Sequence, residues 1–310
     1  MLLRTELPHT PLQMPIDVAD GVLLVGSCFT SHIGEWLEGA WLRVMVNPWG
    51  ILFNPASIAQ SLQRCLADGR EEFLLYAREG QWVSFDHHGS LSAPSPEQLT
   101  ARLTDVDRQA RTFLSDARHV IVTWGTAWVF ERQGHIVANC QKAPPSEFVR
   151  RRLTVDEIVA QWQPIIQSTG LHFIFTVSPI RHLADGLHGN QLSKATLLLA
   201  IERLQALFPR QVEYLPVYEL LLDDLRDYRF YADDLVHPAP LAITAVRELF
   251  SDCAFTPRLR SYMLEAADIA RTLNHRPSHP ESPEHQALLA RTLQRKQKLT
   301  ECLRNSGVKE

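Results

Sequence analysis

Runs of consecutive apolar residues recur along the chain and predict buried strands. The first run, Val22-Leu23-Leu24-Val25, stops at Gly26-Ser27. Such a run is typical of a strand that is covered on both faces in a parallel sheet. Comparable runs predict further strands at residues 41–46, 119–125, 171–177 and 212–217.

Helical signals separate these strands. Asn54 followed by Pro55 marks a helix start, because asparagine caps a first turn and proline fits its first position. Thr154 with Glu157 forms a capping box. Helices are predicted to begin at Thr30 or Ser31 and to cover residues 55–67, 95–117, 154–168, 192–208 and 238–251. Strands that alternate with helices predict an α/β fold on a right-handed, doubly wound parallel sheet of about five strands.

The chain divides into three expected regions. Residues 1–20 form an irregular arm, residues 21–255 the α/β domain and residues 256–310 a helical C-terminal extension. Aromatic and turn residues at 72–96 predict a β-hairpin insertion, and the Gln133-Gly134 turn a second hairpin. The extension contains helices at 258–273 and 283–304. The second has a thin leucine stripe, which predicts packing on its own domain or in a homo-oligomer.

Composition narrows the expected partners and compartment. The formal net charge is −4 and no basic block precedes the C-terminal helix, so neither nucleic acid nor a membrane is expected as a partner. The five cysteines contain no C-x-x-C pair, which argues against a disulfide framework and against a zinc site. Residues 1–20 lack the apolar core of a signal peptide. We therefore expect a cytoplasmic protein without a cofactor.

Ser27 is a candidate nucleophile because of where the first strand ends. Ligands of open α/β sheets bind at the carboxyl ends of the strands, and Ser27 lies on the turn from strand to helix. Backbone N–H groups and the helix dipole at that place stabilise an oxyanion. The alternative is that the serine only caps the helix.

A serine hydroxyl needs a base, and residues 233–238 supply a candidate. In Asp234-x-x-His237 the carboxylate reaches the Nδ1 side of the imidazole and leaves Nε2 for Ser27. Pro238 is expected to start the next helix and so to fix the backbone of His237. The alternative is a solvent-exposed acidic loop with a chance histidine.

Four more residues are candidates for substrate binding. Arg181 and His182 follow a strand end, so they lie on the edge of the sheet that carries Ser27. There they bind a carboxylate, a phosphate or a sugar hydroxyl, or they form a salt-bridged loop. Asn190 is a possible helix cap, and Lys194 is expected near the cleft.

Other reactive side chains are assigned no chemistry. Cys28 is expected to be a buried, inert thiol that points away from the reacting groups. His87 and His88, next to Asp86, are adjacent histidines on a turn, which are more often exposed than metal-bound. No metal is assigned.

Several motifs in order resemble a known family. A Gly-Ser turn after the first strand and Asp-x-x-His-Pro before the last core helix resemble the first and last sequence blocks of the SGNH, or GDSL-like, hydrolases. More closely, Gly26-Ser27-Cys28-Phe29-Thr30 resembles the signature of the bacterial GSCFA family, with Thr30 in place of the final alanine. The similarity continues at residues 47–55, 124–129, 137–142, 176–182, 190–196 and 228–234.

The resemblance implies a flavodoxin-like, SGNH-type sheet and a serine-hydrolase site. It implies Ser27 as nucleophile, His237 as general base and then acid, and Asp234 as the group that orients His237. The backbone N–H groups of Ser27 and Gly50 would be oxyanion donors. SGNH hydrolases add an asparagine after the glycine of their third block, but this chain has Gly125-Thr126-Ala127 there.

Either Thr126 or Asn139 replaces that missing donor, or the oxyanion hole is weaker. The function implied is a serine esterase or O-deacetylase, acting on a small-molecule or carbohydrate ester. The alternatives are an O-acyltransferase that uses a thioester donor, and a non-catalytic module that binds a sugar or an anion.

Overall fold

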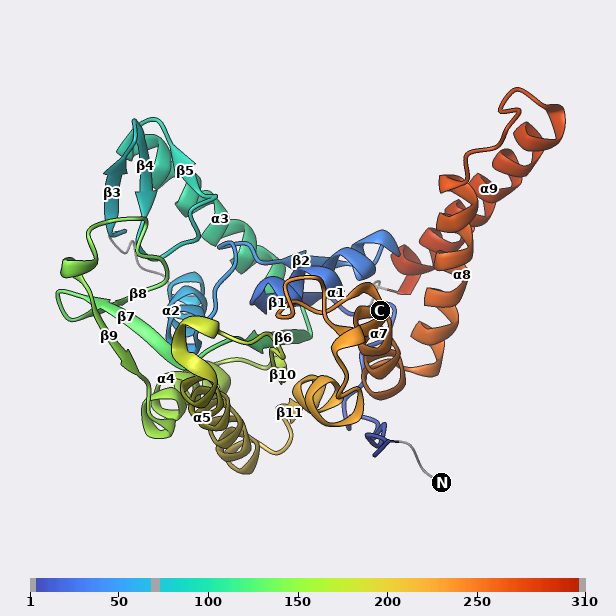
Figure 1. The fold of residues 1–310 in the computed structure, drawn as a ribbon. Coiled ribbons are helices and arrows are strands. Elements are labelled where there is room, and N and C mark those ends of the chain that lie inside the picture. The colour runs from blue at the N-terminus through green and yellow to red at the C-terminus, as the bar shows by residue number, and fades with distance from the viewer. Residues whose placement is uncertain (1–3, 68–72, 307–310) are drawn as a thin grey trace.

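A five-stranded parallel sheet forms the centre of the computed structural model, which describes residues 4–67 and 73–306. The strands lie in the order β2-β1-β6-β10-β11 (Figure 1). Their bounds are β1 Val22–Gly26, β2 Val44–Val46, β6 His119–Trp124, β10 His172–Val177 and β11 Val212–Tyr214. This order is that of a flavodoxin-like fold, so the predicted α/β class is confirmed.

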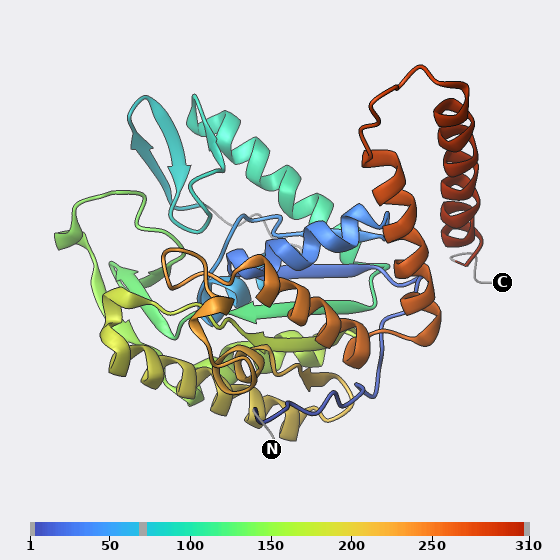
Figure 2. The ribbon, with the colours of Figure 1, turned by 45° about the vertical axis from the view of Figure 1, so that its right-hand side comes forward.

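Helices cover both faces of the sheet. Leu23 and Val25 of β1 face one hydrophobic core, and Val22 and Leu24 face the other, as the two-residue period of a strand requires. Helices α2 Pro55–Leu66, α3 Pro96–Leu114, α4 Val155–Ser168 and α5 Gly186–Leu207 pack in the first core. Helices α1 Cys28–Gly39, α7 Pro240–Ala254 and α8 Pro257–Asn274 pack in the second. Figure 2 shows α1 and α7 over the same face of the sheet.

The predicted caps form where the sequence places them. The Asn54 side chain accepts a hydrogen bond from the Ser57 backbone N–H at the start of α2. At the start of α4, the Thr154 and Glu157 side chains each accept from the other's backbone N–H. Local capping chemistry therefore sets both helix starts.

Three helix starts differ from the prediction. Helix α1 begins at Cys28, before Thr30 and Ser31, with Ser27 at its N-cap position. Helix α5 begins at Gly186, so Asn190 lies within the helix and does not cap it. Helix α7 begins at Pro240 because Pro238 is held in an isolated antiparallel bridge with Tyr231 and its backbone is not yet helical.

Two small antiparallel sheets flank the central sheet. Strands β3 Leu75–Arg78, β4 Gln81–Ser84 and β5 Ser92–Ala93 form the expected insertion, although residues 68–72 before it lie outside the described residues. The predicted hairpin consists of β7 Trp128–Arg132 and β8 His135–Val137. A third strand, β9 Val149–Arg152, pairs with β7 and was not predicted, because three consecutive arginines resemble a solvated loop.

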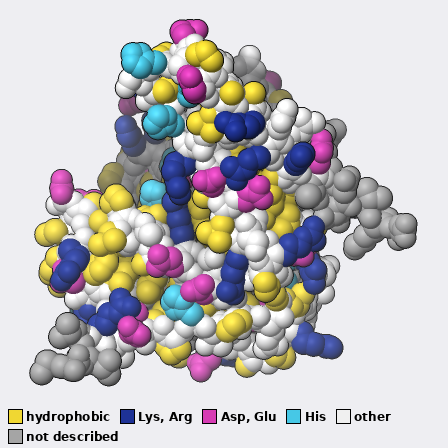
Figure 3. Space-filling model, turned by 90° about the vertical axis from the view of Figure 1, so that its right-hand side faces the viewer, with side chains coloured by type: hydrophobic (Ala, Val, Ile, Leu, Met, Phe, Trp, Pro, Cys, Tyr) yellow, Lys and Arg dark blue, Asp and Glu magenta, His cyan; other side chains and the backbone are white. Residues whose placement is uncertain are grey.

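Helices α8 and α9, Pro283–Ser306, lie on the side of the molecule opposite the two small sheets (Figure 1). Helix α9 packs on α8, and Leu299 enters the second core. Charged side chains of both signs are scattered over this side of the molecule (Figure 3). The N-terminal arm lies beside the end of α7, where the Leu12 N–H donates to the Cys253 carbonyl and the Ile16 N–H donates to the Ala254 carbonyl.

A buried cluster of ionisable groups closes the amino ends of the strands. The Nδ1 atoms of His119 and His172 lie 3.1 Å apart. Nε2 of His119 lies 3.2 Å from the Asp20 carboxylate, and Nε2 of His172 lies 2.8 Å from that of Glu213. The backbone N–H groups of the arm at Gln13 and Met14 donate to Glu213. The cluster thus joins three strands to the arm.

Acidification is expected to destabilise the protein through this cluster. Burial lowers the pKa of His119. Burial alone would raise the pKa of Asp20 and of Glu213, but the histidines and backbone N–H groups bonded to them lower both. A group whose pKa is lowered by folding stabilises the folded protein at pH values above the pKa that the group has in the unfolded chain. That pKa is about 6.5 for histidine and about 4 for the carboxylates, so the stabilisation is lost as the pH falls.

The thermal unfolding midpoint should therefore decrease steadily from about pH 7 to about pH 4. It should decrease less steeply in a double variant, Asp20→Asn with His119→Gln, which removes two of the titrating groups. Equal slopes for the two proteins would show that the cluster does not control the acid sensitivity.

Candidate functional site

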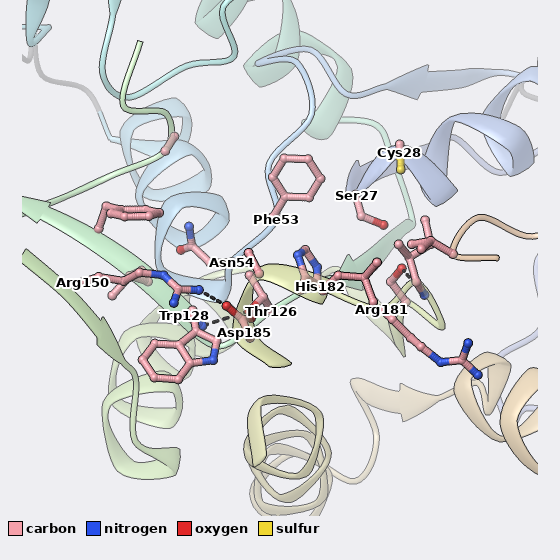
Figure 4. A pocket seen from close by; sticks show the side chains of 18 of the residues that line it. Ser27, Cys28, Phe53, Asn54, Thr126, Trp128, Arg150, Arg181, His182 and Asp185 are labelled. Atoms are coloured by element: carbon pink, nitrogen blue, oxygen red, sulfur yellow. Dashed lines mark hydrogen bonds and ion pairs between the residues drawn. The ribbon is translucent and has the colours of Figure 1, made fainter. Parts of the chain in front are cut away.

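A cavity of about 810 Å³ lies at the carboxyl ends of the central strands (Figure 4). Ser27 enters it from the end of β1, Thr126 from the end of β6 and Ser178 from the end of β10. Strands β1 and β6 are neighbours, but the chain continues from β1 to β2 on one side and from β6 to β10 on the other. Open α/β sheets bind ligands at such a reversal of strand order.

Ser27 has a buried hydroxyl that makes no hydrogen bond in the part of the chain that the structure describes. The residue is 2 % exposed and lines the cavity. It occupies the N-cap position of α1, yet its side chain makes no capping hydrogen bond, and Oγ has no partner within residues 4–67 and 73–306. Buried polar groups are nearly always paired, so an unpaired hydroxyl calls for an explanation. A capping role does not provide it.

The turn that presents Ser27 depends on glycine. Gly26 has a φ of +143°, and a Cβ there would collide with the backbone of Thr123 on β6. The Gly26 N–H donates to the Asn47 side chain at 2.9 Å, and the Gly26 carbonyl accepts from the Leu52 N–H at 3.1 Å. The segment that follows β2 therefore fixes the end of β1 from the opposite side.

Asp234 and His237 form the pair that their spacing predicts. The Asp234 carboxylate lies 2.5 Å from Nδ1 of His237 and accepts the backbone N–H groups of Val236 and His237, each at 2.9 Å. These bonds, the backbone N–H of His237 first, lower the pKa of Asp234 to about 2. Both side chains are about half exposed, and both line the cavity that contains Ser27. The contact to Nδ1 leaves Nε2 as the ring nitrogen for a further partner.

Arg181 braces the loop that carries this pair. Its guanidinium donates to the Tyr231 hydroxyl at 3.1 Å and to the Leu235 carbonyl at 3.4 Å, and lies 4.6 Å from the centre of the Tyr231 ring. In Figure 4 it points away from Ser27. The arginine charge is thus engaged with the loop, although its residue is part of the cavity wall.

His182 is a second imidazole in the cavity. Its ring meets Phe53 edge to face, with 6.1 Å between the ring centres. Burial, and then the nearby Lys194 ammonium, lower the pKa of His182 to about 4. The ring is therefore neutral at ordinary pH. Its backbone N–H donates to the Asn190 side chain at 3.1 Å, so Asn190 supports the loop from behind.

Lys194 lies behind the cavity wall. Its ammonium donates to the carbonyls of Gly125 and Ser178, each at 2.6 Å, and the residue is 1 % exposed. Burial lowers the pKa of Lys194 to about 7. The lysine thus ties the ends of β6 and β10 together. Lys194 and Asn190 were expected to contact a substrate, but neither is part of the cavity wall. Their positions therefore give no direct contact with a ligand in the cavity.

The four predicted oxyanion groups are not all available. The Ser27 N–H donates to the Thr123 carbonyl at 3.2 Å, and the Gly50 N–H donates to the Asn47 carbonyl at 2.8 Å. Thr126 lines the cavity, but its hydroxyl accepts from the Trp128 N–H and contacts Ser193.

Asn139 is the fourth of these groups. Its side chain accepts from the Gln141 N–H at 2.8 Å, and Asn139 is not part of the cavity wall. The structure thus brings Thr126 and Ser27 to the cavity and leaves Gly50 and Asn139 outside it.

Neither of the other reactive candidates competes with Ser27. Cys28 was expected to be buried, but it is only half-buried and lines the cavity next to Ser27. Its partial burial raises the pKa of this thiol, which favours the protonated form. The expectation of an exposed turn is wrong for His87, which is fully buried because its ring contacts Arg64 at 2.9 Å and Ser84 at 2.9 Å. Within the described residues, no three His, Cys, Asp or Glu side chains are placed to hold a metal ion, and no helix is long and apolar enough to cross a membrane.

Comparison with known protein families matches residues 21–250 to the GSCFA family. The chain belongs to the GSCFA family. Residues 266–308 match the C-terminal domain of GSCFA domain proteins. No curated protein matches the chain. The first match includes every residue that lines the cavity described above, from Ser27 to His237, and the second covers the second half of α8 and all of α9.

Several residues of the GSCFA cavity were missed by the sequence reasoning. Phe53, Asn54 and Trp128 lie in segments that resemble the family, but nothing marked them as cavity residues. Arg150 of β9 forms an ion pair with Asp185 and lies 4.6 Å from the Trp128 ring. Only the three-dimensional pairing of β9 with β7 brings Arg150 there, so no local signal predicts it.

Gly26→Ala should destabilise the protein by about 2 kcal/mol or more, since a left-handed backbone alone costs an L-residue roughly 1–2 kcal/mol and a backbone collision adds to it. Gly80→Ala is the matched control, because Gly80 also has a positive φ but has open space around it. Chemical denaturation measures both. Equal losses would show that the contact of Gly26 with Thr123 adds nothing.

Proposed function

We propose that this GSCFA protein is a serine esterase that works through Ser27, His237 and Asp234, in the manner of SGNH hydrolases. One observation carries the proposal. A buried hydroxyl that has no hydrogen-bond partner among the described residues lies in the same cavity as an imidazole whose Nδ1 contacts a carboxylate. These are the three groups that an activated serine requires.

The reaction proceeds in two acyl transfers. Ser27 Oγ attacks the ester carbonyl while Nε2 of His237 accepts the hydroxyl proton, and Asp234 stabilises the resulting imidazolium. The tetrahedral intermediate collapses, the C–O bond to the alcohol breaks, and His237 returns the proton to the leaving alcohol. Water, deprotonated by His237, then releases the acid and restores the Ser27 hydroxyl.

The developing negative charge lies at the start of α1. Ser27 precedes this twelve-residue helix, whose first N–H groups have no acceptor within the helix and whose dipole favours an anion. The usual side-chain asparagine is absent from the turn at Gly125-Thr126. Because a lost oxyanion donor typically costs about 3 kcal/mol, we expect slower turnover than in enzymes with a complete oxyanion hole.

An anion-binding module is the competing function, and the charges of the site favour it less. The Arg181 guanidinium is bonded to the loop at Tyr231 and Leu235. The Lys194 ammonium is buried against two carbonyls, and Arg150 is paired with Asp185. Arg181 and Lys194, which the sequence suggested for an anion, are thus already engaged, and so is Arg150, which only the structure brings to the cavity.

Hydrolysis of p-nitrophenyl butyrate tests the proposal. Ser27→Ala and His237→Ala should each lower kcat by about a thousandfold or more, and Asp234→Asn should lower it strongly as well, because the three residues act as a unit. His88→Ala is the matched control and should leave kcat unchanged. Like His237, His88 lies outside the core, but unlike His237 it is not part of the cavity wall.

Circular dichroism of each variant verifies that it folds. Turnover that persists in folded Ser27→Ala would exclude Ser27 as nucleophile. Absence of turnover in the native protein with every short-chain ester would favour the binding module.

A further inference from the structure

The cavity continues well beyond the reacting groups, and the continuation is apolar. From Ser27 it runs past Phe53 to Trp128 (Figure 4). We call this part the apolar arm and define it by Phe53, Trp128, Phe130, Val137, Ala138 and Leu183, all of which line the cavity. Strands β7 and β8 and the segment that precedes α5 supply most of its wall. Ligand sites of this size are typically apolar with a few placed polar groups.

The charged groups beside the apolar arm compensate one another. Arg150 pairs with Asp185, whose side chain is 2 % exposed, and the guanidinium covers the Trp128 ring at 4.6 Å and the Phe130 ring at 5.5 Å. His182 lies between the apolar arm and Ser27 (Figure 4), and its burial lowers its pKa and keeps the ring neutral. A charged ligand group would lose its hydration here without gaining a free counter-charge, so the arm suits an uncharged, apolar group.

The positions of Ser27 and His237 decide which part of an ester enters the arm. His237 must return a proton to the leaving alcohol, so the alcohol lies beside that imidazole, whose side chain is 53 % exposed. The acyl group is attached to the other side of the carbonyl carbon that Ser27 attacks. It therefore extends away from His237, along the apolar arm.

We propose that the apolar arm is an acyl-binding subsite, and that the preferred substrates are esters of an uncharged acyl chain several carbons longer than acetyl. This inference rests on the proposed esterase function. It narrows the substrate class from ester in general to esters of medium-length acids, with the alcohol at the open side of the cavity.

A series of p-nitrophenyl esters, from acetate through butyrate and hexanoate to octanoate, tests the preference. Each buried methylene is worth about 0.8 kcal/mol, so kcat/KM should increase roughly three- to fourfold per methylene until the arm is filled. Leu183→Asp places a carboxylate in the arm and should abolish the increase from acetate to octanoate. Leu187→Asp is the matched control, because Leu187 is similarly exposed, 68 % against 59 %, but is not part of the cavity wall.

Binding to Ser27→Ala separates the subsite from the chemistry. Calorimetric titration with octanamide, a neutral ligand that cannot be cleaved without the nucleophile, should show binding that acetamide lacks and that Leu183→Asp removes. If no ester is turned over but octanamide binds in this way, the esterase proposal fails and the subsite remains. If acetate is turned over as well as octanoate and neither amide binds, the esterase remains and the subsite is excluded.

Discussion

The close contact of Gly26 with the backbone of Thr123 is the constraint on which the site depends. At this point β1 ends against β6, and only a residue without a Cβ fits. The same turn places Ser27 at the head of α1 with its hydroxyl in the cavity. The strand order reverses between β1 and β6, so α1, which follows β1, and α4, which comes after β6 and the small β7–β9 sheet, pack on opposite faces of the central sheet. Open α/β sheets bind ligands at such a reversal.

The second half of the site is held by contacts that are distant in the sequence. Arg181, which follows β10, binds the loop before α7 through Tyr231 and Leu235. Within that loop, Asp234 holds both the ring and the backbone of His237. Lys194 joins the ends of β6 and β10, because its ammonium donates to the carbonyls of Gly125 and Ser178. Arg181, Asp234 and Lys194 thus hold backbone groups in place, and the cavity itself keeps a largely apolar wall.

Much of the fold was predictable because its signals are local. The apolar run before Gly26 predicts β1, Asn54-Pro55 predicts the start of α2, and Thr154 with Glu157 predicts the start of α4. The Asp234 to His237 contact was predictable for the same reason, since the partners are only three positions apart in the sequence. Strand β9 with Arg150 and the engagement of the Ser27 N–H depend on partners far along the chain. No local pattern encodes such partners, so their outcome required the structure.

The central claim is that Ser27 is an activated nucleophile. A fluorophosphonate reacts covalently with an activated serine, and mass spectrometry of the digested protein locates the adduct. The account predicts a single adduct on the peptide that contains Ser27, formed in the native protein and lost in His237→Ala. An adduct on another residue, or the same rate of labelling without the imidazole of His237, would contradict it.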